Sequence, residues 1–125
     1  MEAIPSAYEE LLRKARDLFS TDPSAQQVLC MLTSRGKIVR FANHDIMSGN
    51  TSEEAAFINV LVHVGDTSIR YAVCMWNGGT LDVPSRHLRN SLILLNPANR
   101  NAAFLLNSTS GLTLRPLQAM LPSRR

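Results

Sequence analysis

The sequence predicts an α/β protein in which a mixed five-stranded sheet is covered by helices on both faces, a three-layer α/β/α arrangement. Segments with helical spacing of apolar residues alternate with short β-compatible segments, in the order α-β-β-α-β-α-β-β-α. The third strand follows a crossover helix, and such a connection is typical of a sheet that mixes parallel and antiparallel neighbours.

Length and composition indicate one globular domain. The 125 residues fit a single domain over positions 1–125, with fraying expected at 1–5 and 122–125. Apolar residues make up 45% of the chain and charged residues 18%, a balance that supports a substantial core. The longest apolar runs are far shorter than the roughly 20 residues of a membrane span. No basic segment precedes an apolar one at the N-terminus, so we expect no signal peptide, no membrane partner and a cytoplasmic location.

Charge and cysteine content exclude further classes. The net charge is +3, but the basic residues are scattered and do not alternate with aromatic ones, so we do not expect nucleic acid as a partner. Cys30 and Cys74 each stand alone in an apolar segment. This spacing fits neither a disulfide framework nor a metal knuckle, and it predicts two reduced core residues in an intracellular protein.

The first helix and the hairpin after it have recognisable start and turn signals. Ser6 and Glu9 have the spacing of a capping box, and apolar residues at helical spacing then continue to about Ser20. Residues 27–33 and 37–42 are apolar and β-compatible, with a short polar turn between them. We predict a helix followed by a β-hairpin.

The second predicted helix is unusually apolar. Thr51 or Ser52 caps it, it runs from Glu53 to about Val64, and Gly65 stops it. Because apolar residues occupy nearly all its sides, we expect this helix to be central and buried.

The remaining elements are shorter. Pro84 suits the first turn of a helix, where its missing N–H costs nothing, and this helix is expected to continue until Pro97. Strands are expected at residues 69–75, 102–106 and 112–115, followed by a helical turn at 117–121.

Two polar segments, residues 43–54 and 84–89, each lie where a loop leads into a helix. Backbone N–H groups at the start of a helix point outward and attract polar groups. We therefore predict that these two segments line one pocket.

Four segments carry a family resemblance: Phe41-Ala-Asn43-His-Asp45, Thr51-Ser-Glu-Glu54, Pro84-Ser-Arg-His-Leu-Arg-Asn90 and Met120-Leu-Pro-Ser123. Together they resemble the small cytidine deaminases, and most of all the blasticidin-S deaminase branch. In that family a hairpin ends in Gly-Val-Asn-x-(Glu or Tyr), one helix opens with Cys-Ala-Glu, the next with Pro-Cys-x-x-Cys-Arg-Gln, and the chain closes on Leu-Leu-Pro. The match covers nearly the whole chain and implies a cytidine-deaminase-like fold.

The same resemblance implies that the family's three zinc ligands fall on Ser52, Ser85 and Leu88. Hydroxyls are poor zinc ligands and a hydrocarbon is none, whereas catalytic zinc takes three Cys, His or carboxylate donors. Without zinc, water stays close to its bulk pKa and hydroxide attack loses its main source. We expect no metal and no cofactor.

Three matched residues keep the family's chemistry. The resemblance implies that Glu54 is the proton shuttle, which is not a zinc ligand, and that Asn43 and Asp45 hold a sugar. The alternative is that Glu54 only helps to cap its helix, because Thr51-x-x-Glu54 is also a capping-box pattern.

Other candidates have two interpretations each. Ser52 and Ser85 either bind a polar group of a ligand or simply cap their helices. Arg89 either contacts a ligand or a neighbouring subunit, or it is a solvated or salt-bridged helix residue.

The histidines are candidate proton carriers or substitute metal ligands. His87 lies between two of the lost zinc-ligand positions, and His44 lies beside Asn43 and Asp45 on an extended segment and is expected to face the other way. A rebuilt metal site from His44, Asp45 and His87 remains an alternative.

These observations predict a zinc-less protein of the cytidine-deaminase fold that binds a small polar or heterocyclic molecule. If it is an enzyme, Glu54 performs metal-free acid/base chemistry of the isomerase, lyase or cyclase type. For any of these functions we expect a homo-oligomer, either a dimer or a tetramer. One alternative function is a non-catalytic ligand-binding or assembly module. Another is a hydrolytic nucleoside or blasticidin-type deaminase with substitute metal ligands. The predicted ligand-binding residues are Asn43, Asp45, Ser52, Ser85, His87 and Arg89.

Overall fold

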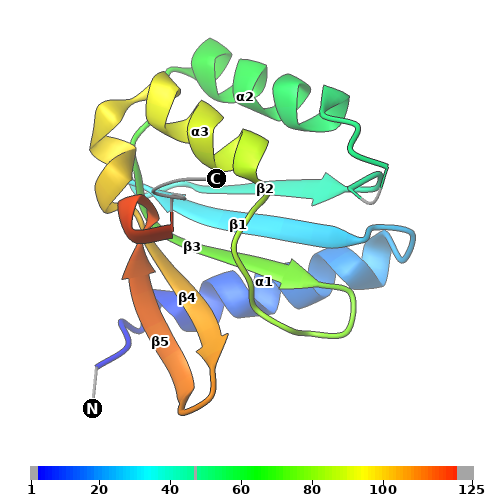
Figure 1. The fold of residues 1–125 in the computed structure, drawn as a ribbon, viewed down its shortest axis with the longest axis vertical. Helices are drawn as coiled ribbons and strands as arrows, with labels where there is room; N and C mark the ends of the chain where they lie inside the picture. Colours follow the sequence, from blue (N-terminus) through cyan, green and yellow to red (C-terminus); the bar gives the residue numbers. More distant parts are fainter. Residues whose placement is uncertain (1–2, 47, 121–125) are drawn as a thin grey trace.

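A computed structural model describes residues 3–46 and 48–120, and they form three layers (Figure 1). The sheet has the strand order β2-β1-β3-β4-β5, with α1 on one face and α2 and α3 on the other. The elements are α1 (Ala7–Thr21), β1 (Gln27–Thr33), β2 (Ile38–Asn43), α2 (Ser52–Val64), β3 (Ile69–Trp76), α3 (Arg86–Leu95), η1 (Pro97–Asn101), β4 (Ala103–Ser108), β5 (Gly111–Pro116) and η2 (Leu117–Met120), where η marks a 3-10 helix.

The predicted α/β class and mixed sheet are confirmed. β3 and β4 are parallel neighbours joined through α3, and the other neighbouring strands are antiparallel. The three-layer arrangement therefore follows from the one crossover that the order of elements indicated. Part of the expected fraying, at residues 1–2 and 122–125, lies outside the described residues, as does residue 121 of the last predicted turn.

The sheet separates two apolar cores. On one face α1 packs its buried residues, such as Tyr8 and Leu11, against β1 and β3. On the other face Phe57 and Leu61 of α2 and Leu92 of α3 cover the sheet. Cys30 and Cys74 are buried and free, one in each core.

The predicted capping box at the start of α1 is wrong. Ser6 occupies the N-cap position, but its backbone is already helical, with φ −63° and ψ −22°, and its hydroxyl makes no capping hydrogen bond. A capping side chain works from an extended backbone, which this residue lacks. Between α3 and β4 the structure also has η1, which is not among the elements expected from the sequence.

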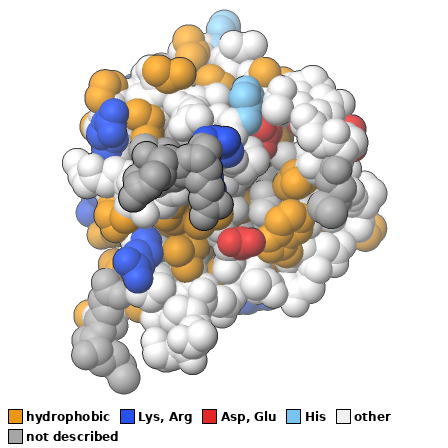
Figure 2. Space-filling view, viewed as in Figure 1, with side chains coloured by type: hydrophobic (Ala, Val, Ile, Leu, Met, Phe, Trp, Pro, Cys, Tyr) orange, Lys and Arg blue, Asp and Glu red, His pale blue; other side chains and the backbone are white. Residues whose placement is uncertain are grey.

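The expectation that α2 is central and buried is also wrong. Its buried residues are Glu54, Phe57 and Leu61, whereas Val60, Val62 and Val64 are 55%, 56% and 53% exposed. The helix lies in an outer layer, so only one stripe of it reaches the sheet. In Figure 2 hydrophobic side chains are visible at the top of the view, where α2 lies in Figure 1. The predicted stop is confirmed, because Gly65 has the left-handed conformation, with φ 70°.

Within residues 3–46 and 48–120, no helix has both the length and the apolar content needed to cross a membrane.

Candidate functional site

Three neighbouring elements bring the two polar segments together. Asn43 is the last residue of β2, Glu54 lies in the first turn of α2, and Ser85 and His87 lie at the start of α3. Both helices lie on the same face of the sheet, so their first turns meet above the end of β2. The predicted convergence of residues 43–54 and 84–89 is therefore observed.

The Glu54 carboxylate is the centre of this cluster. It is 3% exposed, and its Oε2 accepts hydrogen bonds from the Ser85 hydroxyl at 2.6 Å and from Asn43 Nδ2 at 3.3 Å. Its Oε1 lies 3.0 Å from Nδ1 of His87. Thr51 occupies the N-cap position but makes no side-chain capping hydrogen bond, so the capping-box interpretation of Glu54 does not describe this structure.

Ser85 takes the capping role that the sequence left open, and it also contacts Glu54. Its hydroxyl donates to Glu54 and also accepts a hydrogen bond from the backbone N–H of Leu88 at 3.1 Å, which makes it the N-cap of α3. The capping bond fixes the hydroxyl oxygen, and its proton is then directed at the carboxylate.

A small pocket opens beside this cluster. Its volume is about 240 Å³, and its lining residues are Ile46, Gly49, Asn50, Thr51, Glu54, Ser85, Arg86 and His87. The His87 side chain is 45% exposed, and its Nε2 has no hydrogen-bond partner among the described residues. A carboxylate only accepts hydrogen bonds, so Nδ1 carries the proton that faces Glu54, and Nε2 of a neutral ring is then a free base.

Asn43 and Asp45 are not among the residues that line the pocket, and their hydrogen bonds hold the Glu54 carboxylate and the loop after β2. Asn43 is 2% exposed, and its Oδ1 accepts from the backbone N–H of Asp45 at 3.3 Å. The Asp45 carboxylate accepts from the hydroxyl of Ser48 at 2.6 Å and from Nδ2 of Asn50 at 3.2 Å. These hydrogen bonds lower the pKa of Asp45, and they tie its carboxylate to its own loop.

Ser52 and Arg89 stand apart from the Glu54 cluster. The exposed Ser52 hydroxyl donates to Oδ1 of Asn50 at 2.8 Å, and Ser52 does not line the pocket. Arg89 donates from Nη1 to the carbonyl of Pro84 at 3.0 Å, which braces the segment before α3. Burial lowers the pKa of Arg89, and its Nε is buried with no partner among the described residues.

His44 faces away from Glu54, as its position on an extended segment predicted, and joins a second cluster. Its Nδ1 lies 2.7 Å from Oε2 of Glu53, and its Nε2 lies 2.6 Å from Oδ2 of Asp22. Hydrogen bonds with Glu53 and Asp22 raise the pKa of His44. Neither Asp22 nor Glu53 stands out in the sequence as a partner of His44, because their positions far from His44 in the chain give no local signal. This clasp ties the ends of α1 and β2 to the start of α2.

The residues present do not fit a catalytic zinc ion. Ser52, Ser85 and Leu88 supply two hydroxyls, both engaged in hydrogen bonds, and a buried hydrocarbon. His44 and Asp45 have partners of their own and do not converge on His87. Across residues 3–46 and 48–120, no group of three or more His, Cys, Asp or Glu side chains is arranged to hold a metal ion.

Solved structures of cytidine deaminases share this fold. The enzyme from Mycobacterium leprae superposes with a TM-score of 0.67 at 14% identity, covering 95% of this chain and 100% of that one. The enzyme from Mycobacterium tuberculosis gives 0.65 at 17% identity, covering 95% and 97%, and that from Burkholderia pseudomallei gives 0.65 at 13%, covering 94% and 98%. No protein-family model and no curated protein matches the sequence. The likeness shows a cytidine-deaminase fold over nearly the whole chain.

Proposed function

We propose that this protein binds a small polar or heterocyclic molecule in the pocket beside Glu54 and transfers protons on it without a metal. The observation that carries the proposal is the buried Glu54 carboxylate, hydrogen-bonded to Ser85 and Asn43 and paired with His87 at the wall of a 240 Å³ pocket. Titratable pairs in clefts are where acid/base chemistry is concentrated in enzymes.

In this proposal Glu54 and His87 have different roles. Glu54 holds the imidazole of His87 with Nδ1 protonated, so that Nε2 takes a proton from the bound molecule and returns it elsewhere. Ser85 and Asn43 keep the carboxylate in place through their hydrogen bonds. The reaction class that needs only such proton transfer is isomerisation, elimination or cyclisation.

The remaining predicted binding residues take supporting parts. Asp45 orders the loop that forms one rim of the pocket, and Arg89 braces the segment that carries Ser85. Ser52 lies outside the pocket lining and contributes through Asn50, which does line it.

A second candidate function is a non-catalytic binding or assembly module. It is favoured by the hydrogen bonds of Glu54, since both carboxylate oxygens already have partners within the protein. The exposed Val64 of α2 and Leu94 of α3 would suit a homo-oligomer, dimer or tetramer.

The test is a screen of nucleosides, nucleobases and other polar heterocycles against protein dialysed with a chelator, comparing wild type with Glu54→Gln. Glu9→Gln removes an exposed carboxylate from α1, on the other face of the sheet, and is the matched control. We expect turnover that falls by roughly a hundredfold or more in Glu54→Gln, as for loss of a general acid/base, and that is unchanged in Glu9→Gln.

Three results separate the candidates. Turnover that survives in Glu54→Gln contradicts the acid/base role. Saturable binding without turnover in the wild type favours the binding module. About one equivalent of zinc that survives dialysis, together with turnover of cytidine or blasticidin, establishes the hydrolytic deaminase with substitute ligands.

A further inference from the structure

β2 is one of the two edge strands of the sheet. It lies at the end of the strand order and, among the described residues, pairs only with β1. The Lys37 carbonyl accepts a hydrogen bond from the N–H of Thr33 in β1 at 2.8 Å. The Asn43 carbonyl accepts one from the N–H of Gln26, the residue before β1, at 2.9 Å. Since the backbone groups of a strand alternate in direction, those of Ile38, Arg40 and Ala42 point to the open edge.

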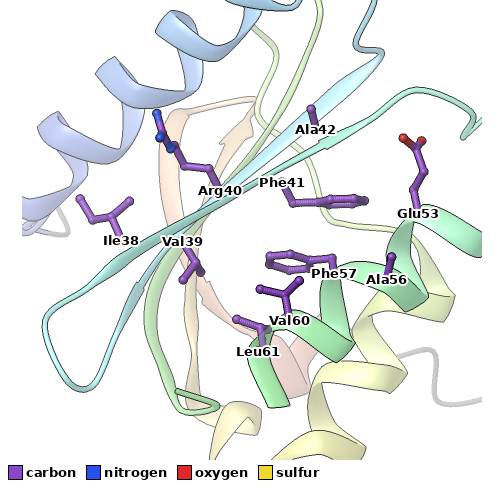
Figure 3. Close-up of a pocket in the computed structure, with 10 residues that line it drawn as sticks. All are labelled: Ile38, Val39, Arg40, Phe41, Ala42, Glu53, Ala56, Phe57, Val60 and Leu61. Carbon is purple, nitrogen blue, oxygen red and sulfur yellow. The ribbon is translucent and has the colours of Figure 1, made fainter. Parts of the chain in front are cut away.

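A groove follows this open edge. It has a volume of about 580 Å³ and lies between β2 and α2 (Figure 3). Five consecutive β2 residues, Ile38 to Ala42, form one side, and α2 forms the other with a stripe at helical spacing: Glu53, Ala56, Phe57, Val60 and Leu61. The groove extends for about 13 Å along the strand, since each residue advances about 3.3 Å.

Apart from Arg40 and Glu53, the residues that line the groove are apolar. Phe41 stacks on Phe57 with ring centroids 4.8 Å apart and an interplanar angle of 15°. Val39 points to the same side of the strand, and Val60 stands on the opposite wall, 55% exposed. A chain segment laid along β2 would place every second side chain against these groups.

The opposite side of the strand carries a positive charge. In Figure 3 Arg40 points away from Phe41 and Phe57. It is exposed, and its guanidinium forms no ion pair with any described residue. Side chains directly opposite one another on neighbouring strands interact, and opposite charges there are favourable.

We propose that this groove binds an extended peptide segment of another protein, with alternating apolar and acidic residues, as a sixth strand on β2. The free N–H and C=O groups of Ile38, Arg40 and Ala42 require a partner with the same spacing of acceptors and donors, which an extended chain supplies. Apolar side chains of the peptide enter the groove beside Val60, and an acidic side chain on its other face meets Arg40. This site is separate from the Glu54 pocket and does not depend on the function proposed there.

Charge favours such a peptide over a second copy of the chain. In a two-fold pairing of two β2 edges centred on Arg40, the two guanidiniums stand opposite each other. The neighbouring symmetric registers pair Arg40 with Ile38 or Ala42 and leave the two arginines as diagonal neighbours. Like charges at these positions destabilise a strand pair.

The test uses a fluorescein-labelled peptide, Val-Glu-Val-Glu-Val, followed by fluorescence anisotropy. We expect saturable binding that is weakened about tenfold or more by Val60→Glu, because a carboxylate then occupies the groove wall. Val62→Glu is the matched control, with the same exposure but about 200° away around the helix, and it should leave the affinity within about twofold. Circular dichroism shows whether each variant is folded.

Two further arms test the charge and the backbone. Arg40→Glu should lose the Glu peptide and gain a Val-Lys-Val-Lys-Val peptide. N-methylation of the residues whose N–H groups face the edge should abolish binding, namely the two Glu residues if the peptide pairs antiparallel and the central Val if it pairs parallel. The proposal is overturned if neither peptide binds saturably, or if Val60→Glu and Val62→Glu weaken binding equally. It is also overturned if the wild-type protein sediments as a dimer that Arg40→Pro dissociates, since a second copy then occupies the edge.

Discussion

The substitution Glu54→Gln tests the geometry of the site without requiring a ligand. Gln keeps the shape of the side chain, and its oxygen can replace Oε2, which accepts from Ser85 at 2.6 Å and from Asn43 at 3.3 Å. Its amide nitrogen then faces Nδ1 of His87, where Oε1 was 3.0 Å away. An amide nitrogen donates, so Nδ1 must accept and the proton of a neutral ring moves to Nε2. The free base of the pocket is lost by this change of tautomer.

The expected loss of stability is small. A hydrogen bond to a charged group contributes about 1.5–3 kcal/mol to stability, and one between neutral groups about 0.5–1.5 kcal/mol. Each hydrogen bond that changes from a charged to a neutral acceptor therefore loses roughly 1 kcal/mol. The Ser85 bond dominates because the Asn43 bond is long and the His87 side chain is 45% exposed. We therefore expect Glu54→Gln to lower the free energy of unfolding by about 1–2 kcal/mol.

Two assays measure these effects. Urea unfolding followed by circular dichroism gives the stability, and ring ¹⁵N chemical shifts give the tautomer of His87. Glu53→Gln is the control for the tautomer, because the neighbouring Glu53 carboxylate contacts His44 instead. A His87 ring that keeps its proton on Nδ1 in Glu54→Gln would refute the reasoning, as would a variant more stable than the wild type.

Three other predictions concern the scaffold. The pKa of His44 is raised above its ordinary 6.5 by its two carboxylate partners, so its contribution is complete below about pH 6.5 and is lost as the pH rises through the raised value. The melting temperature of the wild type should therefore exceed that of His44→Gln most at mildly acidic pH, and a gap that widens toward alkaline pH would contradict the clasp. Phe57→Ala should destabilise by about 3–5 kcal/mol in urea unfolding, whereas Val60→Ala, at a 55% exposed position, should change stability by less than about 0.5 kcal/mol; equal effects would mean that α2 is buried all round. Cys30 and Cys74 should react with a thiol reagent only after unfolding, because burial raises the pKa of both thiols, and rapid labelling of the native protein would contradict the core packing.

Regular elements were predictable because their signals are local. The residues of β1 and the stop of α2 at Gly65 follow from apolar patterning and from a glycine that takes a left-handed conformation. The expected burial of α2 failed because composition does not show which sides of a helix meet the sheet. Its buried residues are Glu54, Phe57 and Leu61, with Ile58 partly buried against the same core, although the exposed Val60 and Val62 are also apolar.

The candidate site was predictable in its location but not in its contacts. The start of each helix marked the segments of Glu54 and of Ser85 with His87, and the structure brings them together. The pairing of His87 with Glu54 joins residues 33 positions apart, which no local pattern reports. The clasp at His44 was missed for the same reason, since Asp22 comes from the end of a different helix.

The most direct test of the account is a binding titration of the molecule identified in the heterocycle screen, performed on chelator-dialysed protein with and without added zinc. The account predicts saturable binding in the absence of zinc, unchanged when zinc is added and weakened about tenfold or more in Glu54→Gln. Binding that appears only after zinc is restored, or that is equally strong in Glu54→Gln, would contradict it.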